Sequence, residues 1–272
     1  MPETARAAVD VLEDAGFEVE VLDQHLCCGR PLYDYGFLDM AKSYLRRNLM
    51  ALRPYISTNT PMVVLEPSCC SVFRDELRNL FPDSSEAKRL AENTFTLSEF
   101  LEKKVSGYQP PEIRRQAIVQ GHCHHKAVMR MKEEQSLMNK MLLDHHVLES
   151  GCCGMAGAFG YEKDKYQVSV ACGERALLPE VRKAPVSSII VADGFSCKEQ
   201  IAQETGRHAL HLAEVLRLGL VGSEKQPPTM YPESYFVQPR KDAQKKSMAR
   251  AAMVSGVALA ALAFLWIKSR RR

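Results

Sequence analysis

Apolar residues along the first 110 positions recur at helical spacing in some stretches and at strand spacing in others. Residues 17–22 alternate between apolar and polar side chains as a half-buried strand does, and residues 62–65 form an apolar run typical of a buried parallel strand. Pro54 is expected to end one helix, and Ser68 is placed to cap another. The spacing predicts helices over residues 2–14, 34–55, 72–80 and 97–101.

The second half repeats this order of elements. A strand at residues 117–119 is followed by a long amphipathic helix that should reach about residue 143, and a second buried strand is expected at residues 188–191. The paired histidines His145 and His146 are expected in a surface loop. Further helices are predicted over residues 166–178, from residue 193 onward and over residues 211–216.

Cysteines have nearly the same spacing in the two halves. Cys28 precedes Cys69 by 41 positions, and the corresponding pair in the second half is separated by 44. Strands that alternate with helices predict an α/β fold, here a tandem pair of Rossmann-like or flavodoxin-like parallel-sheet units that arose by internal duplication. The units are assigned to residues 1–110 and 111–222. The first unit starts at the helix that should follow a leading strand, so we expect it to be incomplete at its N-terminus.

The chain changes character beyond residue 222. Residues 223–250 contain four prolines among many polar residues, which predicts a linker. Residues 251–267 carry no charge over 17 positions and are followed by a basic tail to residue 272. Seventeen residues are the lower limit for crossing a bilayer, so a membrane-anchoring helix is predicted, with an interfacial or partner-packing helix and a disordered tail as alternatives. Basic residues on both sides leave its orientation open.

Composition narrows the class of protein. A chain of 272 residues with 46% hydrophobic residues can bury a substantial core. The net charge is only +3, from 36 basic and 33 acidic residues, so no charge field indicates a nucleic-acid partner. Nine cysteines, an odd number that includes vicinal pairs, and the lack of a signal peptide favour a reducing, cytoplasmic location over a secreted disulfide scaffold.

The cysteines of the second half all stand at the ends of predicted strands or in a glycine-rich turn. The carboxyl ends of parallel strands meet at one edge of a sheet, so thiols that are far apart in sequence should converge there. Four thiolates suit either a tetrahedral zinc ion or an iron–sulfur cluster. The glycine-rich turn favours the cluster, because its backbone N–H groups are free to face sulfide. The residues of this set are Cys123, Cys152, Cys153 and Cys197.

Several segments resemble a known family. The chain, over about residues 4–218, is similar to the cysteine-rich CCG domain family of the heterodisulfide reductase B subunit, the iron–sulfur subunits of glycolate oxidase and anaerobic glycerol-3-phosphate dehydrogenase, and lactate-utilisation proteins. It is most similar to the C-terminal part of fused FAD-linked oxidases of the D-lactate dehydrogenase kind. The likeness is carried by Leu65-Glu66-Pro67-Ser68-Cys69, Gly121-His122-Cys123-His124-His125-Lys126 and Gly151-Cys152-Cys153-Gly154-Met155-Ala156-Gly157.

The resemblance implies a tandem α/β fold that holds unusual, non-cubane [4Fe-4S] clusters. The full ligand set it implies is Cys123, Cys152, Cys153 and Cys197. The first copy matches only at Cys27, Cys28 and Cys69, because its leading cysteine is absent. Three thiolates would hold a labile second cluster or require a further ligand, for which His25 and Cys70 are candidates; Cys70 and Cys172 are otherwise expected not to be ligands.

Basic side chains flank the cysteines. His122, His124 and His125, together with Lys126, would lower the pKa of the neighbouring thiol and place positive charge beside a negative cluster. Direct ligation, proton transfer to a bound substrate, and ordinary polarity at a helix start remain alternatives for these histidines. Arg30 is interpreted either as a contact for a substrate carboxylate or partner, or as a solvated arginine.

Three functions are compatible with these residues. The leading hypothesis is an electron-transfer module that accepts electrons from FAD, on a partner subunit or on a domain outside this chain, and passes them to a quinone or cytochrome. The flavin partner would oxidise a 2-hydroxy acid such as lactate or glycolate, since no residue here resembles the acid/base that this oxidation requires. Thiol–disulfide reduction of the heterodisulfide type and a zinc-stabilised interaction domain are the alternatives.

Overall fold

The computed structural model describes residues 2–222 and 231–270, with side chains described as far as residue 253. The chain divides into two compact units, residues 1–232 and residues 233–272. The first unit contains both cysteine sets. The second contains a single described helix, α13 (Ser234–Arg270).

Two small parallel sheets lie in the first unit. β1 (Met62–Val63) pairs with β2 (Thr94–Phe95). β3 (Gln116–Val119) lies between β4 (Asp144–Val147) and β5 (Ile189–Val191), in the order β4-β3-β5. The fold is therefore mixed α/β with parallel strands, as the sequence predicts, although most of the described residues are helical.

The helices of the first half enclose one apolar core. Buried leucines on one face of α3, at positions 45, 49 and 52, contact Phe73 and Leu77 from the helices after β1. Cys28 also borders this core. The helices are α1 (Pro2–Asp14), α2 (Arg30–Asp34), α3 (Leu38–Thr58), α4 (Pro67–Ser71), the π-helical η1 (Val72–Glu76), α5 (Leu77–Leu80), α6 (Ser85–Glu92) and α7 (Leu97–Lys104).

The second half has its own core beneath the larger sheet. Ile190 of β5 packs with Leu178, Val181 and Ile201, and the core reaches Cys153 and Cys197. The helices are the π-helical η2 (His125–Met129), α8 (Lys132–Lys140), the short η3 (Phe159–Tyr161), α9 (Tyr166–Glu174), α10 (Leu177–Lys183), α11 (Phe195–Thr205) and α12 (Leu212–Val221).

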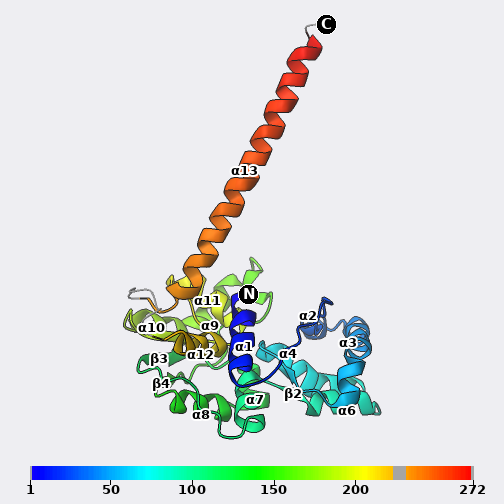
Figure 1. The fold of residues 1–272 in the computed structure, drawn as a ribbon, viewed down its shortest axis with the longest axis vertical. Coiled ribbons are helices and arrows are strands. Elements are labelled where there is room, and N and C mark those ends of the chain that lie inside the picture. The colour runs from blue at the N-terminus through cyan, green and yellow to red at the C-terminus, as the bar shows by residue number, and fades with distance from the viewer. Residues whose placement is uncertain (1, 223–230, 271–272) are drawn as a thin grey trace. The chain divides into compact units, whose positions relative to one another are not determined.

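Helices of the first half pack against helices of the second half. The first helix of the chain, α1, packs against α12 at the end of the second half, whereas α7 at the end of the first half packs against α8 (Figure 1). Thr4 of α1 donates a 2.9 Å hydrogen bond to Glu214 of α12, and Ser136 of α8 donates one of 3.1 Å to Glu102 of α7. Each half therefore completes the burial of a helix from the other.

Helices α7 and α12 begin in the same way. Thr96 and Glu99 form a capping box at α7, and His211 and Glu214 form one at α12. Both glutamates are almost fully buried, and each pairs with a basic residue that follows a cysteine by one to five positions. Lys198 lies 2.8 Å from Glu214, and Arg74 lies 2.5 Å from Glu99. The pairing satisfies a charge that would otherwise be costly to bury.

Glu214→Gln is expected to make the unfolding free energy of the protein depend less on pH in the acidic range. Burial alone would raise the pKa of Glu214, but the Lys198 ammonium and the His211 N–H more than offset it and hold the pKa below its usual value. Such a carboxyl stabilises the fold above its unfolded pKa of about 4.3, and this contribution is lost as the pH falls further. Urea unfolding between pH 7 and pH 3 should show a smaller loss of unfolding free energy in the variant than in the wild type. If the unfolding free energies of the two proteins fell in parallel with pH, this expectation would be contradicted.

Several predicted elements differ in the structure. Residues 17–22 form no strand, because no described strand lies beside them to accept their backbone hydrogen bonds. Pro54 does not end its helix, which continues to Thr58. The buried Leu52 and Ile56 hold the turns around the proline, and Asn59 ends the helix in a left-handed conformation.

The helices of the second half are shorter than predicted. The helix expected to run to residue 143 is interrupted at Arg130, whose φ of 63° is incompatible with a right-handed helix. Ala176 separates α9 from α10 with a φ of −152°, which is extended and lies outside the helical range. His145 and His146 lie in strand β4 and not in a loop, since β3 provides a partner for their backbone.

The tail is helical further towards the N-terminus than predicted. Helix α13 begins at Ser234, so part of the expected 223–250 linker is helical, and Pro239 lies within the helix. Residues 223–230 are outside the described part of the chain. The candidate membrane segment, residues 251–267, lies within α13, but its side chains from residue 254 onward are also outside the description. Among the residues that are described, no helix is both long enough and apolar enough to span a bilayer.

Candidate metal centre

The larger sheet brings together the four cysteines of the second half. Cys123 follows β3, the vicinal pair Cys152 and Cys153 follows β4, and Cys197 lies in the first turn of α11 after β5. Since β4, β3 and β5 are adjacent and parallel, their carboxyl ends share one edge. The topology therefore places all four residues at that edge.

The four thiols act on one another in pairs: Cys152 interacts with Cys123 and Cys153, and Cys153 interacts with Cys197. These interactions lower the pKa of Cys152 far below its usual value and raise those of Cys123 and Cys153, because one thiolate is stabilised by its protonated neighbours. All four are free cysteines; Cys153 and Cys197 are buried, whereas Cys123 and Cys152 are exposed. A group of this kind releases protons when it binds a thiophilic metal.

The turn that holds the vicinal pair is shaped around Gly154. Its φ is +97°, and a Cβ atom at this position would lie 1.9 Å from the carbonyl oxygen of Ser169. Its N–H donates to the sulfur of Cys152 over 3.3 Å. These features fit an iron–sulfur cluster. Such clusters are bound by cysteine thiolates, and hydrogen bonds to sulfur adjust their reduction potential. The site offers four thiols and a backbone N–H that already faces one of them.

Lys126 forms hydrogen bonds to the segment that precedes this turn. Its ammonium donates to the carbonyl oxygen of Leu148 over 3.1 Å and to that of Ser150 over 2.8 Å. Burial lowers the pKa of Lys126 despite the neighbouring thiols of Cys197 and Cys123. One side chain from the Cys123 segment thereby positions the loop that leads to the vicinal pair.

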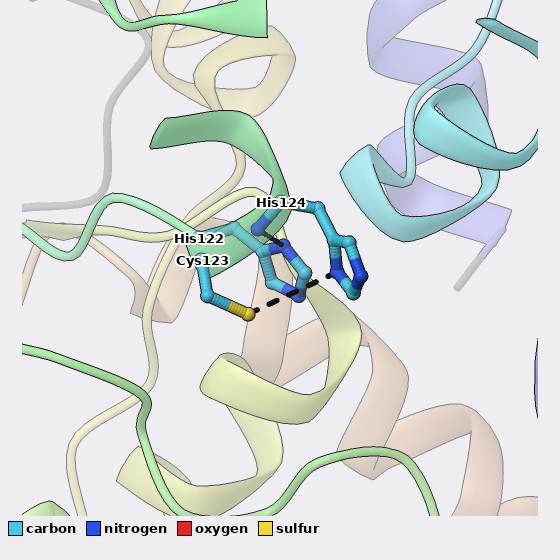
Figure 2. A group of neighbouring side chains, drawn as sticks. All are labelled: His122, Cys123 and His124. Carbon is cyan, nitrogen blue, oxygen red and sulfur yellow. Dashed lines mark hydrogen bonds between the residues drawn. The ribbon is translucent and has the colours of Figure 1, made fainter. Parts of the chain in front are cut away.

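His122 and His124 lie on either side of Cys123 along the chain, and their rings stack with centroids 5.3 Å apart (Figure 2). The backbone N–H of His124 donates to Nδ1 of His122 over 3.2 Å. Nδ1 of His124 lies 3.8 Å from the Cys123 sulfur. Burial lowers the pKa of both rings, because it disfavours their charged form. Gly194 allows His122 to approach, because a Cβ there would lie 2.2 Å from the ring.

The first-half cysteines form a second sulfur group. The sulfurs of Cys28 and Cys69 are 2.9 Å apart, and Cys27 is close enough to contribute to the raised pKa of Cys69. The hydrogen bond from Cys69 lowers the pKa of Cys28 to about 7 against the opposing effect of burial, with help from Arg30. The structure therefore brings Cys28 and Cys69 into contact, whereas Cys27 is exposed and acts on Cys69 only through its charge.

Neither candidate for a further ligand joins that group. His25 is exposed, and the fully buried Cys70 lies beside Arg74, where burial raises its pKa to about 12. Cys172 is half-buried on α9, and its Cβ lies under the Gly154 turn.

Arg30 is not a solvated side chain. It is 9% exposed and forms ion pairs with Glu76 and with Asp34, the latter at 3.1 Å. It also donates to the hydroxyl of Ser71 over 2.6 Å. The guanidinium thus pairs with Asp34 of its own helix and with Glu76 and Ser71 of the helices after β1, while its buried Nε makes no hydrogen bond within the described residues.

Sequence reasoning missed Glu66, which connects the halves. Its side chain accepts from Ser68 N–H at the start of α4 and from Phe195 N–H at the start of α11, over 3.3 Å and 2.7 Å. It also lies 4.0 Å from Nε2 of His122. A carboxylate directly before Pro67 is a local signal for the N-cap of α4. No local pattern indicates that the same side chain also accepts from the start of α11, 129 positions away.

Comparisons with known proteins relate this chain to a cysteine-rich domain and to two groups of proteins. Residues 1–74, which include the first sulfur group, match the family model described as the CCG cysteine-rich domain. The C subunit of the anaerobic glycerol-3-phosphate dehydrogenase of Escherichia coli (strain K12) is 25% identical over 80% of this chain and 56% of its own length. Lactate utilization protein A of Bacillus velezensis is 26% identical over 78% of this chain and 91% of its own, and that of Bacillus subtilis is 24% identical over the same shares.

The chain thus spans about half of the glycerol-3-phosphate dehydrogenase subunit and nearly all of the lactate utilization proteins. These alignments extend well beyond residue 74, so the relationship is not limited to the segment that the family model covers. The resemblance to the cysteine-rich CCG domain is confirmed for residues 1–74, and most of the chain is similar to a dehydrogenase subunit and to lactate utilization proteins, whereas the likeness to fused FAD-linked oxidases stays a prediction.

Proposed function

We propose that this chain is an iron–sulfur electron-transfer module in which Cys123, Cys152, Cys153 and Cys197 hold a [4Fe-4S] cluster. The observation that carries the proposal is the placement of four cysteines at the ends of three adjacent parallel strands, where their thiols act on one another. When bound, such a cluster supplies one-electron transfer. The protein positions its ligands through Lys126 and the Gly154 turn and leaves two of them exposed for a partner to approach.

The electron donor in this proposal is FAD on a partner subunit or domain. The names of the relatives, a glycerol-3-phosphate dehydrogenase subunit and lactate utilization proteins, are consistent with a flavin enzyme that oxidises a hydroxy acid or a related alcohol. A quinone or a cytochrome would accept the electrons. Oxidation of the organic substrate is assigned to the partner, and the module is placed in the cytoplasm, attached to the membrane if residues 251–267 bind lipid.

A tandem origin of the two halves supports a second metal group in this module. The reciprocal packing of α1 on α12 and of α7 on α8, and the matched capping boxes of α7 and α12, are what a duplicated unit would leave. We therefore retain Cys27, Cys28 and Cys69 as ligands of a second, partial cluster.

Iron and acid-labile sulfide analysis with EPR tests the main assignment. Anaerobically purified Cys153→Ser should lose the iron, the sulfide and the EPR signal of the second-half cluster, because one of four ligands is removed. Cys172→Ser is the matched control: it changes a half-buried cysteine near the same turn and should leave all three unchanged. A colourless wild type that contains zinc would refute the electron-transfer proposal and favour a zinc-stabilised interaction domain.

One observation favours thiol–disulfide chemistry as a second candidate. Cys28 and Cys69 have their sulfurs 2.9 Å apart, and the pKa of Cys28 is about 7, so a thiolate and its resolving thiol are already adjacent. The Cys28 thiolate would attack a substrate disulfide and release one thiolate, and Cys69 would then displace the second. Intact mass after treatment with a small disulfide would show a loss of two hydrogens in the wild type but a retained mixed disulfide in Cys69→Ser. An unmodified mass in both proteins would exclude this candidate.

A further inference from the structure

Three side chains that the proposed cluster does not use meet in the interior of the first unit. His125 starts η2, Glu134 lies on α8, and Asp193 follows β5. Each offers one ligand atom, and these three atoms lie within 4.8 Å of one another. Ligand atoms bound about 2.1 Å from one metal ion lie roughly 3–4 Å apart, so small side-chain rotations would bring all three onto a single ion.

All three side chains are buried. His125 and Glu134 are 1% and 2% exposed, and the side chain of Asp193 is 8% exposed. Among the described residues, no lysine or arginine forms an ion pair with either carboxylate. A buried carboxylate without a compensating charge is costly. The positive charge that offsets these two must therefore come from a histidine or from a bound cation.

His211 lies beside Asp193 but presents no N–H to it. Its Nδ1 accepts the N–H of Ala213 over 3.0 Å, and its Nε2 donates to the carbonyl oxygen of Leu65 over 2.9 Å. The Nδ1 lone pair therefore faces Oδ1 of Asp193, 3.6 Å away. That oxygen accepts the backbone N–H of Leu212 over 2.8 Å, which is a neutral donor. The charge of Asp193 is thus not paired by His211.

Two buried atoms of this group have no hydrogen-bond partner in the part of the chain that the structure describes. They are Nε2 of His125 and Oε2 of Glu134. The Glu134 oxygen lies 3.0 Å from Nδ1 of His125, inside the group, without the alignment of a hydrogen bond. Buried polar atoms in folded proteins are nearly always paired, and an unpaired one indicates a bound water or ion.

We propose that His125, Glu134 and Asp193 bind a divalent metal ion at a site separate from the cysteines. An imidazole nitrogen with two carboxylate oxygens is a donor set for Mn²⁺, Fe²⁺ or Zn²⁺. The ion would connect η2, which starts two residues after Cys123, to the end of β5, four residues before Cys197. It would thereby position two strand ends that carry cysteines. None of its ligands belongs to the proposed cluster, so the inference does not depend on that cluster.

Manganese binding tests this site, because Mn²⁺ prefers oxygen ligands to thiolates. The full-length, anaerobically purified chain is titrated with Mn²⁺, and the free ion is measured by EPR at room temperature. The wild type should bind Mn²⁺ saturably. Glu134→Gln and Asp193→Asn keep the side-chain size but remove the charge, and each should weaken binding by more than the roughly 10–100-fold that loss of an outer hydrogen-bond partner costs. Pulsed EPR of the Mn²⁺-loaded wild type should show an imidazole ¹⁴N coupling that is lost in His125→Gln.

Glu133→Gln is the matched control, since Glu133 is the neighbouring carboxylate on α8 and pairs with Lys103 over 3.1 Å. It should bind Mn²⁺ as the wild type does. Absence of saturable binding in the wild type would overturn the assignment, as would equal affinity in the wild type and in Glu134→Gln or Asp193→Asn. An equal loss in Glu133→Gln would also overturn it. A Mn²⁺-loaded wild type without an imidazole ¹⁴N coupling would do so even if neither carboxylate variant folded.

Discussion

Gly154→Ala is expected to destabilise the fold and to abolish metal binding at the second-half cysteines. Its φ of +97° lies in a region that side chains other than hydrogen rarely tolerate, and its added Cβ would lie 1.9 Å from the Ser169 carbonyl oxygen. Relief requires the turn to move away from α9, which breaks the N–H contact to the Cys152 sulfur. Backbone strain of about 1–3 kcal/mol and overpacking of about 1–3 kcal/mol together predict a loss of about 2–6 kcal/mol.

Gly157→Ala separates steric overlap from backbone strain. Gly157 also has a positive φ, +66°, but no atom lies within 4 Å of the position that its Cβ would take. Its substitution should cost only about 1–2 kcal/mol, the penalty for a left-handed residue, and should leave iron binding intact. Urea unfolding of the two variants, with iron analysis of each, measures the difference. Equal losses in both would show that the Ser169 contact does not constrain the turn.

Glu76→Ala is expected to be the most destabilising change in the first half. The substitution leaves the Arg30 guanidinium buried, with only Asp34 as a carboxylate partner, and Asp34 is about half exposed. Breaking a buried ion pair by removing one partner typically costs about 3–5 kcal/mol. Part of the effect should appear at Cys28, because the Arg30 N–H and charge help to lower the pKa of its thiol.

The pair between Arg53 and Glu86 provides the comparison. It is exposed on both sides, so Glu86→Ala should change the unfolding free energy by no more than about 1 kcal/mol. Replacing both buried partners, by Arg30→Met together with Glu76→Leu, should recover much of the stability lost in Glu76→Ala, since no unpaired charge then remains. A loss below about 1 kcal/mol in Glu76→Ala, the range of an exposed pair, would show that the buried pair does not stabilise this half.

Local patterns predicted the elements that carry the cysteines. The strands at β3 and β5, the helix α7 and the glycine-rich turn at Gly154 were all visible, because short apolar runs and glycines report local backbone states. The convergence of four thiols at one sheet edge followed from parallel topology alone.

Local sequence patterns could not predict contacts between residues that are far apart in the sequence. Residues 17–22 alternate as a strand does, but no strand in the described part of the chain pairs with them. The alternation itself does not show whether a pairing strand exists. Glu66 accepts from the start of α11, and Arg30 is held by Glu76; both contacts depend on how helices from different segments meet. Reciprocal packing of α1 on α12 is likewise set by the assembled fold.

Anaerobic native mass spectrometry tests most directly whether four distant cysteines hold one cluster. The chain with serine substitutions at Cys27, Cys28 and Cys69 is reconstituted with iron and sulfide, which leaves only the second-half group. We expect one addition of four irons and four sulfides per chain, which is lost when Cys197→Ser is added. An addition that survives Cys197→Ser, or the absence of iron in the parent, would contradict the account.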